Sequence, residues 1–136
     1  MKYIITESQY KKLMEQKVLH IPDVKIFGNW NNLQKFLERK GNPPYTLGGS
    51  LILDFGELTN LGNLISVEGD LRLSNSQIES LGTLQTVSGN LDLENSKLKS
   101  LGNLTSVGGV LDLYGTNIKS LGNLQTVGDY LDLRKI

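Results

Sequence analysis

Three aspartates, Asp92, Asp112 and Asp132, recur at intervals of 20 residues, each between two leucines in the segment LDL. If the surrounding segments stack as parallel strands, these carboxylates lie about 4.8 Å apart in one column. Like charges that face each other on neighbouring strands destabilise a sheet. The column is therefore either a solvated face that is tolerated for solubility or a contact surface for a basic partner.

Aromatic and charged side chains flank the aspartate column on the same predicted face. Aromatic residues often anchor protein interfaces, which favours the contact interpretation. The predicted partner-binding face consists of Arg72, Asp92, Glu94, Asp112, Tyr114, Tyr130 and Asp132.

A divalent cation is another use of stacked carboxylates, because hard cations prefer oxygen ligands. No loop of the sequence supplies the remaining ligands, so we predict no metal and no cofactor. Catalysis finds little support either. The chain has no cysteine, its one histidine is His20 in the segment VLHIPD, and neither a G-x-x-x-x-G-K-[ST] loop nor a G-x-S-x-G elbow occurs. We predict that the protein is not an enzyme.

The aspartates belong to a repeat that determines where they lie. From Leu61 onward the segments LGNLISVEGDLRLSNSQIES, LGTLQTVSGNLDLENSKLKS, LGNLTSVGGVLDLYGTNIKS and LGNLQTVGDYLDLRKI follow one another without insertion or deletion. A fixed period of 20 residues indicates a solenoid, in which each rung buries its apolar residues against its neighbours. We expect one continuous leucine-rich core.

Within a rung the apolar spacing changes. In VEGDLRL the leucines alternate with polar residues, which predicts a half-buried strand. In LGNLISV the apolar residues recur at every third position, which predicts a tight turn resembling a 3₁₀-helix. Six inward columns follow for the first clear rung: Leu61, Leu64, Val67, Leu71, Leu73 and Ile78.

The preceding residues read as a cap on this array. We expect residues 1–44 to form a helical N-terminal cap with two short helices, over residues 7–16 and from Asn29 to Gly41, joined by an extended connection or short edge strand in VLHIPDVKIF. Residues 45–136 form the solenoid, with one degenerate rung, three full rungs and one truncated rung in a single structural unit. The fold class is an α/β solenoid with parallel strands.

The segments LRLSNSQI, LDLENSKL and LDLYGTNI resemble the leucine-rich repeat segment L-x-L-x-x-N-x-L, and the preceding L-x-x-V-x-G-x-L-x-L resembles its receptor L-domain variety. Ser76, Ser96 and Thr116 stand where that family usually has Asn, so their hydroxyls would replace the inward amide hydrogen bonds. The resemblance implies a short right-handed solenoid that recognises proteins through its strand face. The opening MKYIITESQYKKL resembles the starts of small tailed-phage proteins.

Charge is distributed unevenly along the chain. Residues 1–46 hold eight Lys/Arg and four Asp/Glu, whereas residues 47–136 hold six and ten. Neither excess is dense enough for a polyanion-binding face, so we predict a protein partner, with a basic one favoured, and no nucleic acid. No apolar stretch reaches membrane-spanning length and no signal peptide opens the chain, which predicts a cytoplasmic protein, in the host cytoplasm or in a virion if it is phage-encoded.

Self-assembly is the alternative function, because the array stops in mid-rung at LDLRKI. The last strand leaves an open edge that a second copy could cover, either as an end-to-end homodimer or as an open chain. The residues predicted for this self-association edge are Tyr130, Leu131, Leu133 and Arg134. A component of a phage particle would be one such assembly.

Overall fold

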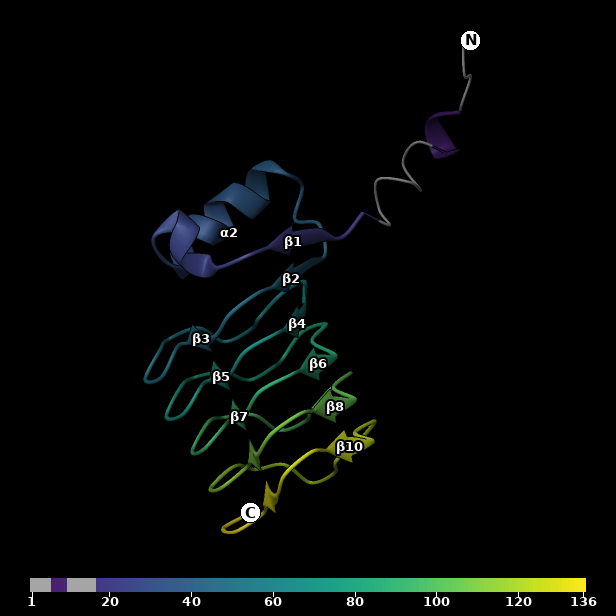
Figure 1. The fold of residues 1–136 in the computed structure, drawn as a ribbon. Coiled ribbons are helices and arrows are strands. Elements are labelled where there is room, and N and C mark those ends of the chain that lie inside the picture. Colours follow the sequence, from purple (N-terminus) through teal and green to yellow (C-terminus); the bar gives the residue numbers. More distant parts are fainter. Residues whose placement is uncertain (1–5, 10–16) are drawn as a thin grey trace.

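The computed structural model describes residues 6–9 and 17–136. From residue 45 onward the chain winds into a solenoid of about four turns, with parallel strands and little helix (Figure 1). The predicted solenoid of parallel strands is confirmed. The degenerate rung is also present, because β2 (Tyr45–Leu47) and β3 (Leu51–Ile52) pair with the strands of the next rung.

Each rung contributes strands to two sheets, both of which are parallel. The six-stranded sheet runs in the order β1 (Leu19–Ile21), β2, β4 (Leu64–Val67), β6 (Thr86–Val87), β8 (Ser106–Val107) and β10 (Thr126–Val127). The five-stranded sheet runs in the order β3, β5 (Leu71–Arg72), β7 (Leu91–Asp92), β9 (Leu111–Asp112) and β11 (Leu131–Asp132).

The segment LGNLISV forms a strand that the sequence interpretation did not predict. The prediction of a 3₁₀-like turn there is wrong, because a turn at Gly62 leads into β4, which pairs with β2 and β6. Gly62 has φ of +66°, a left-handed conformation that glycine adopts without steric cost. The turn places Leu61 before a corner of the rung and Leu64 after it, so a spacing of three brings both inward without a helix.

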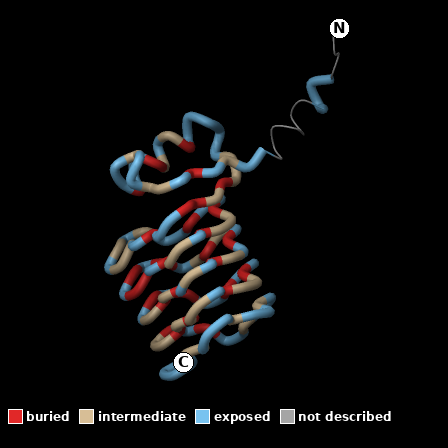
Figure 2. The backbone as a smooth tube through the Cα atoms, viewed as in Figure 1, coloured by how far each residue is buried: buried red, intermediate tan, exposed pale blue. Residues whose placement is uncertain are grey.

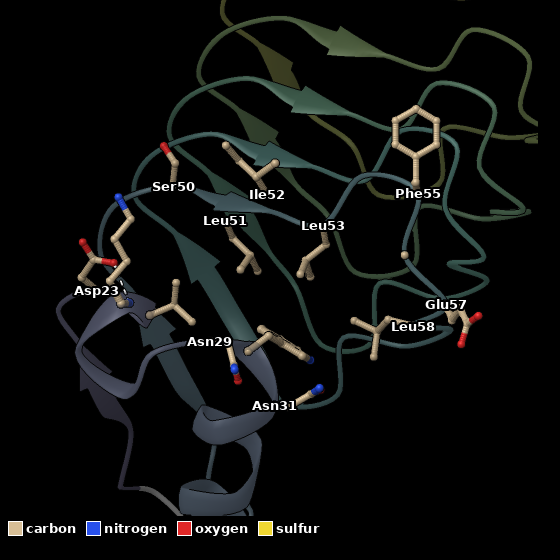
Figure 3. Close-up of a pocket in the computed structure, with 14 residues that line it drawn as sticks. Asp23, Asn29, Asn31, Ser50, Leu51, Ile52, Leu53, Phe55, Glu57 and Leu58 are labelled. Carbon is tan, nitrogen blue, oxygen red and sulfur yellow. Dashed lines mark hydrogen bonds between the residues drawn. The ribbon is translucent and has the colours of Figure 1, made fainter.

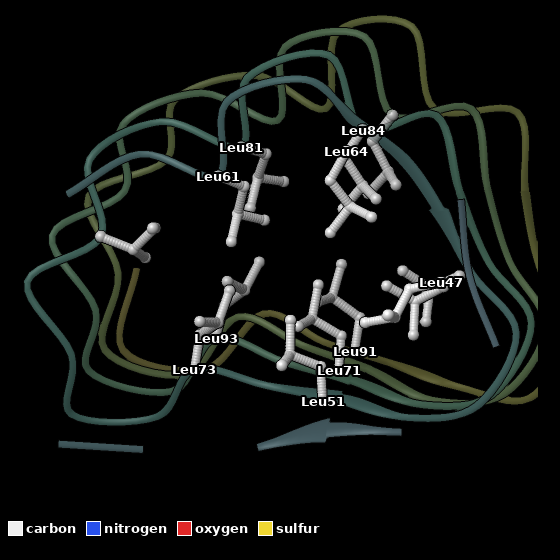
Figure 4. Packing of buried hydrophobic residues seen from close by; sticks show 14 of the residues in the cluster. Leu47, Leu51, Leu61, Leu64, Leu71, Leu73, Leu81, Leu84, Leu91 and Leu93 are labelled. Carbon is white, nitrogen blue, oxygen red and sulfur yellow. The ribbon is translucent and has the colours of Figure 1, made fainter. Parts of the chain in front are cut away.

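The core fills the space between the two sheets. All six predicted inward positions are buried in the rungs that begin at Leu61, Leu81 and Leu101, and Figure 2 shows buried residues repeating from rung to rung. Leucines from opposite walls of a rung point toward one another in Figure 4. Each fully buried leucine stabilises the fold by about 1.5 to 3 kcal/mol, so the repeated columns are the main source of stability.

Two of the three hydroxyls that stand in the repeat at the expected asparagine position form hydrogen bonds to the main chain. The Ser76 hydroxyl donates to the Leu73 carbonyl at 2.6 Å, and the Thr116 hydroxyl donates to the Leu113 carbonyl at 2.8 Å. The Ser96 hydroxyl is buried and finds no hydrogen-bond partner among the described residues. These two bonds stay within one rung and do not link neighbouring rungs.

The segment before the solenoid holds β1, a 3₁₀-helix η1 (Val24–Phe27) and α2 (Trp30–Arg39). The predicted helix after Asn29 is confirmed: the Asn29 side chain accepts a hydrogen bond from the Asn32 amide at 2.8 Å, as an N-cap does. The predicted edge strand is confirmed as β1, which pairs with β2. Of the helix predicted over residues 7–16, residues 7–9 are helical and residues 10–16 lie outside the described residues.

Helix α2 is fixed to the first rung by its apolar side. Trp30, Leu33 and Leu37 are buried in the same cluster as the solenoid leucines. Tyr45 is also buried, and its hydroxyl accepts a hydrogen bond from the Gln34 amide at 3.1 Å. Burial raises the pKa of Tyr45 to about 12.

Close stacking of the rungs depends on a glycine column, which consists of Gly69, Gly89 and Gly109. A methyl group added at Gly89 would collide with a carboxylate oxygen of Asp70 and would also lie 2.8 Å from the Gly69 carbonyl oxygen, which is closer than such atoms approach. The Asp70 side chain could shift, but the Gly69 main chain could not, so a side chain at this position would force two rungs apart.

We expect Gly89→Ala to lower the free energy of unfolding by about 2 kcal/mol, the size typical of overpacking. The matched control is Gly102→Asn, since Gly102 has φ of +57° and its nearest obstructing atom would be 3.9 Å away. Asparagine tolerates that conformation, so the control changes stability by less than about 1 kcal/mol. Urea unfolding followed by circular dichroism measures both, and equal losses would contradict close stacking.

Candidate functional site

The predicted face lies on the outer side of the five-stranded sheet, where the strand register brings its members together. Arg72 pairs with Asp92, Asp92 with Asp112, and Asp112 with Asp132 across β5, β7, β9 and β11. Their neighbours in sequence, such as Leu91 and Leu111, are buried. The alternation of a strand thus points each of these charged side chains outward in one column.

Each aspartate of the column also holds a bend at the end of its strand. The carboxylate of Asp92 accepts a hydrogen bond from the Glu94 amide at 3.0 Å, and that of Asp112 accepts one from the Tyr114 amide at 2.9 Å. Asp132 does the same for the Arg134 amide at 3.0 Å. The short side chain of aspartate suits a hydrogen bond from the amide two residues further on. This is a structural reason for aspartate at these positions, and the sequence interpretation missed it.

Arginines neutralise the two ends of the face. At one end Arg72 lies 2.8 Å from a carboxylate oxygen of Asp54, and at the other end Arg134 lies 2.8 Å from one of Asp132. Asp54 also accepts a hydrogen bond from the Ser74 amide at 3.0 Å. It thereby supplies the carboxylate that holds this bend, because the strand of that rung has Arg72 at the aspartate position. The charge that remains uncompensated therefore lies in the middle of the face.

Three carboxylates occupy this middle: Asp92, Glu94 and Asp112, which we call the acidic triad. One oxygen from each lies within 4.8 Å of the others. None of the three forms an ion pair with any part of the chain that the structure describes. The triad is half-buried, so its negative charge is less screened by water than that of a fully exposed side chain.

The triad shifts the protonation of its own members. Burial raises the pKa of Asp92, and the neighbouring charges of Asp112 and Asp54 raise it further, against a lowering by its bond to the Glu94 amide. The pKa of Glu94 is raised by desolvation and then by the charges of Asp112, Asp92 and Asp132. By contrast, hydrogen bonds from Arg134 lower the pKa of Asp132. Holding the negative charges of the triad together therefore costs the folded state some stability.

The two tyrosines of the face differ in availability. Tyr130 is 62% exposed. Tyr114 is half-buried, and the Arg134 guanidinium lies 5.6 Å from the centre of its ring in a cation–π contact. Tyr130 is therefore open to a partner, whereas Tyr114 is partly covered by Arg134.

Among the described residues, the acidic triad is the one group of three or more His, Cys, Asp or Glu side chains close enough together to share a metal ion. The three oxygens have a spacing that a divalent cation can bridge, but calcium needs six to eight oxygen ligands. Exposed acidic groups often gather without an ion. The prediction that the protein holds no metal stays a prediction.

The residues predicted for self-association lie on β11 and just beyond it. β11 pairs with β9 and, in the described part of the chain, with no strand on its other edge. Leu131 is half-buried, Leu133 is 47% exposed, and Tyr130 and Arg134 are exposed. Apolar surface and unpaired main-chain groups therefore coincide at this edge.

Other polar columns prove to be structural rather than available for contact. The side chains of Ser50, Asp70 and Asn90 each accept a hydrogen bond from the amide 20 residues further on, at 2.8 to 3.0 Å. The hydroxyls of Ser80, Ser100 and Ser120 each accept a hydrogen bond from the glycine amide two residues on, and so hold the turns there. The 20-residue spacing of small acceptors was the sequence signal for the first column.

No family model matches this sequence, and neither curated proteins nor solved structures show a significant similarity to it. Among the described residues, no helix has the length and apolar character needed to cross a membrane.

We expect Asp92→Asn to raise the free energy of unfolding at pH 7 by about 0.5 kcal/mol, the size of a solvent-screened cross-strand pair. Asparagine keeps an oxygen that can accept the Glu94 amide while the charge is removed. Because the folded-state pKa of Asp92 lies above its ordinary value of 3.8, ionisation destabilises the fold as the pH rises through this range. The gain should therefore vanish below that ordinary value.

Urea unfolding at a series of pH values checks this, with Asp132→Asn as the control. The pKa of Asp132 is lowered by Arg134, so neutralising it should give no gain at pH 7. A stability loss with Asp92→Asn at pH 7 would show that its charge supports the fold.

Proposed function

We propose that this chain is a non-enzymatic protein-binding module that recognises a basic partner through the outer face of its five-stranded sheet. The observation that carries the proposal is the acidic triad, whose oxygens lie within 4.8 Å of one another without an ion pair in the described chain. The fold holds these charges together although two of them have a raised pKa. A lysine or arginine from a partner would relieve that repulsion.

The arrangement around the triad supports recognition of a protein rather than of a small molecule. Tyr130 adds an exposed aromatic side chain beside a charged patch on a rigid sheet. Arg72 and Arg134, which are held by Asp54 and Asp132, limit the negative region along the column. The expected partner thus presents one basic cluster flanked by neutral or acidic groups.

We further propose that the solenoid is a right-handed member of the leucine-rich repeat type, with the α2 segment as its helical N-terminal cap. The buried columns and the L-x-L-x-x-[ST]-x-[IL] segments support this assignment, as does the packing of Trp30 and Leu33 on the first rung. Proteins of that type bind other proteins through their strand face, which is consistent with the position of the triad.

The binding face is tested by combining Asp112→Lys with Tyr130→Ala in one variant. Proteins captured from the native host by the immobilised wild-type chain supply the candidate partner, and titration calorimetry then measures its affinity for each variant. We expect the double variant to weaken binding by at least a hundredfold, which corresponds to about 3 kcal/mol for a reversed central charge and a lost aromatic anchor.

The matched control is Glu79→Lys, which makes the same change of charge at an exposed residue of another column. It should leave the affinity within about twofold, the size expected for a distant, screened charge. If the double variant bound as tightly as the wild type, the outer strand face would not be the binding site.

Self-assembly through the C-terminal rung is the second candidate function. The observation that favours it is the edge of β11 that no described strand pairs with, which lies beside the exposed Leu133. Under this hypothesis light scattering detects a dimer or a chain of copies, and Leu133→Lys returns it to the monomer. A wild-type protein that stays monomeric at the highest concentration reached would exclude both forms.

A further inference from the structure

The N-terminal segment covers the first rung unequally. In the six-stranded sheet, β1 pairs with the edge of β2 that faces the N-terminal segment. In the five-stranded sheet, β3 is an end strand, and among the described residues it pairs with β5 alone. In the part of the chain that the structure describes, the strand position above β3 is therefore vacant.

A groove occupies this vacant position. It has a volume of about 1030 Å³ and runs between β3 with its following turn and the start of η1 and α2. Figure 3 shows Leu51 and Leu53 directed toward the cap side of the groove, with Ile52 on the other side of the strand. Both residues of β3, Leu51 and Ile52, line the groove.

The main chain of β3 can pair with an added strand. The amides of Leu51 and Leu53 donate to the carbonyls of Asp70 and Arg72, which lie in the direction of β5. Main-chain groups of successive residues in a strand point to opposite edges, so the amide and carbonyl of Ile52 face the groove. Asn31 adds a side-chain amide on the opposite wall.

Exposed apolar side chains adjoin the same edge. Ile52 is 61% exposed and Phe55 is 76% exposed. Phe55 also has φ of +58°, a left-handed conformation that is uncommon for an aromatic residue. The equivalent corners of the next rungs have Asn75, Asn95 and Gly115, residues suited to positive φ. The first rung thus holds an exposed phenylalanine where folding alone favours asparagine or glycine.

The groove also has a charge pattern. Asp23 lies at the end near Ser50, and Glu57 lies at the end near Leu58 (Figure 3). The Lys25 main-chain amide donates a hydrogen bond to the Asp23 carboxylate at 2.9 Å. Carboxylates at both ends of an apolar edge complement an extended segment that has basic residues on either side of its apolar part.

We propose that the groove is a docking site for an extended peptide segment of another protein, which adds to β3 as a sixth strand. Main-chain hydrogen bonds to Ile52 hold the segment, its apolar side chains pack on Ile52 and Phe55, and its flanking basic residues meet Asp23 and Glu57. This is strand addition to an open sheet edge. The site is separate from the acidic triad and does not require it.

The probe is a fluorescein-labelled peptide of sequence KVTVTVK, measured by fluorescence anisotropy with the full chain. We expect saturable binding that Phe55→Asn weakens roughly tenfold, as loss of a large aromatic contact does. The same substitution relieves the left-handed strain, so it raises the Tm by about 3 to 5 °C. Weaker binding in a more stable protein separates loss of a contact from loss of folding.

Two further comparisons test the mode of binding. Ile26→Asn removes exposed apolar surface outside the groove and should leave the affinity unchanged. Two further peptides each carry N-methyl groups on alternate amides, one on each set. Methylation of the amides that face β3 should abolish binding, whereas methylation of the other set should not, because only one edge of the added strand pairs with β3.

Several results would overturn the proposal. They are the absence of saturable binding, equal binding by both methylated peptides, or an affinity that Phe55→Asn leaves unchanged. Loss of binding with Asp112→Lys instead would place the basic peptide on the acidic triad. Concentration-dependent protection of the Ile52 amide from hydrogen exchange without peptide would assign the groove to a second copy of this chain.

Discussion

Stacking of one rung on the next through parallel main-chain hydrogen bonds is the constraint on which the other features depend. The bonds from Leu71 to Asn90, from Leu91 to Val110 and from Leu111 to Tyr130 repeat one register at 20-residue spacing. That register requires close approach at the glycine column and keeps every inward leucine above its counterpart. It also places every outward side chain one strand away from its counterpart, whether or not their charges agree.

The acidic triad is a consequence of this register. An aspartate that holds the bend after its own strand satisfies a local requirement, since its carboxylate accepts an amide two residues on. Repetition then brings equal charges together, with Glu94 beside them. Asparagine would make the same local bond without the charge. This negative charge is the physical basis of the proposal that the face recognises a basic partner.

Much of the fold follows from the sequence because it depends on periodicity. The inward columns, the degenerate rung and the helix after Asn29 are all predicted from spacing and capping residues. The six-stranded sheet could not be predicted in this way, because the three-residue spacing of LGNLISV suits both a helical turn and a turn followed by β4. Register could place Asp92 beside Asp112. Spacing along the chain could not show that Arg134 covers Tyr114, or that no described strand pairs with the second edge of β3.

Titration of individual side-chain carboxyl carbons by NMR tests the central claim most directly. The account predicts that Asp92 and Glu94 titrate above their ordinary pKa values of 3.8 and 4.5, and that both move toward them in Asp112→Asn. Part of the Asp92 shift should persist in that variant, because burial is its largest cause. If both carboxyl groups titrated at their ordinary pKa values and were unchanged by Asp112→Asn, the outer face would carry no concentrated charge and the proposed basis for recognition would fail.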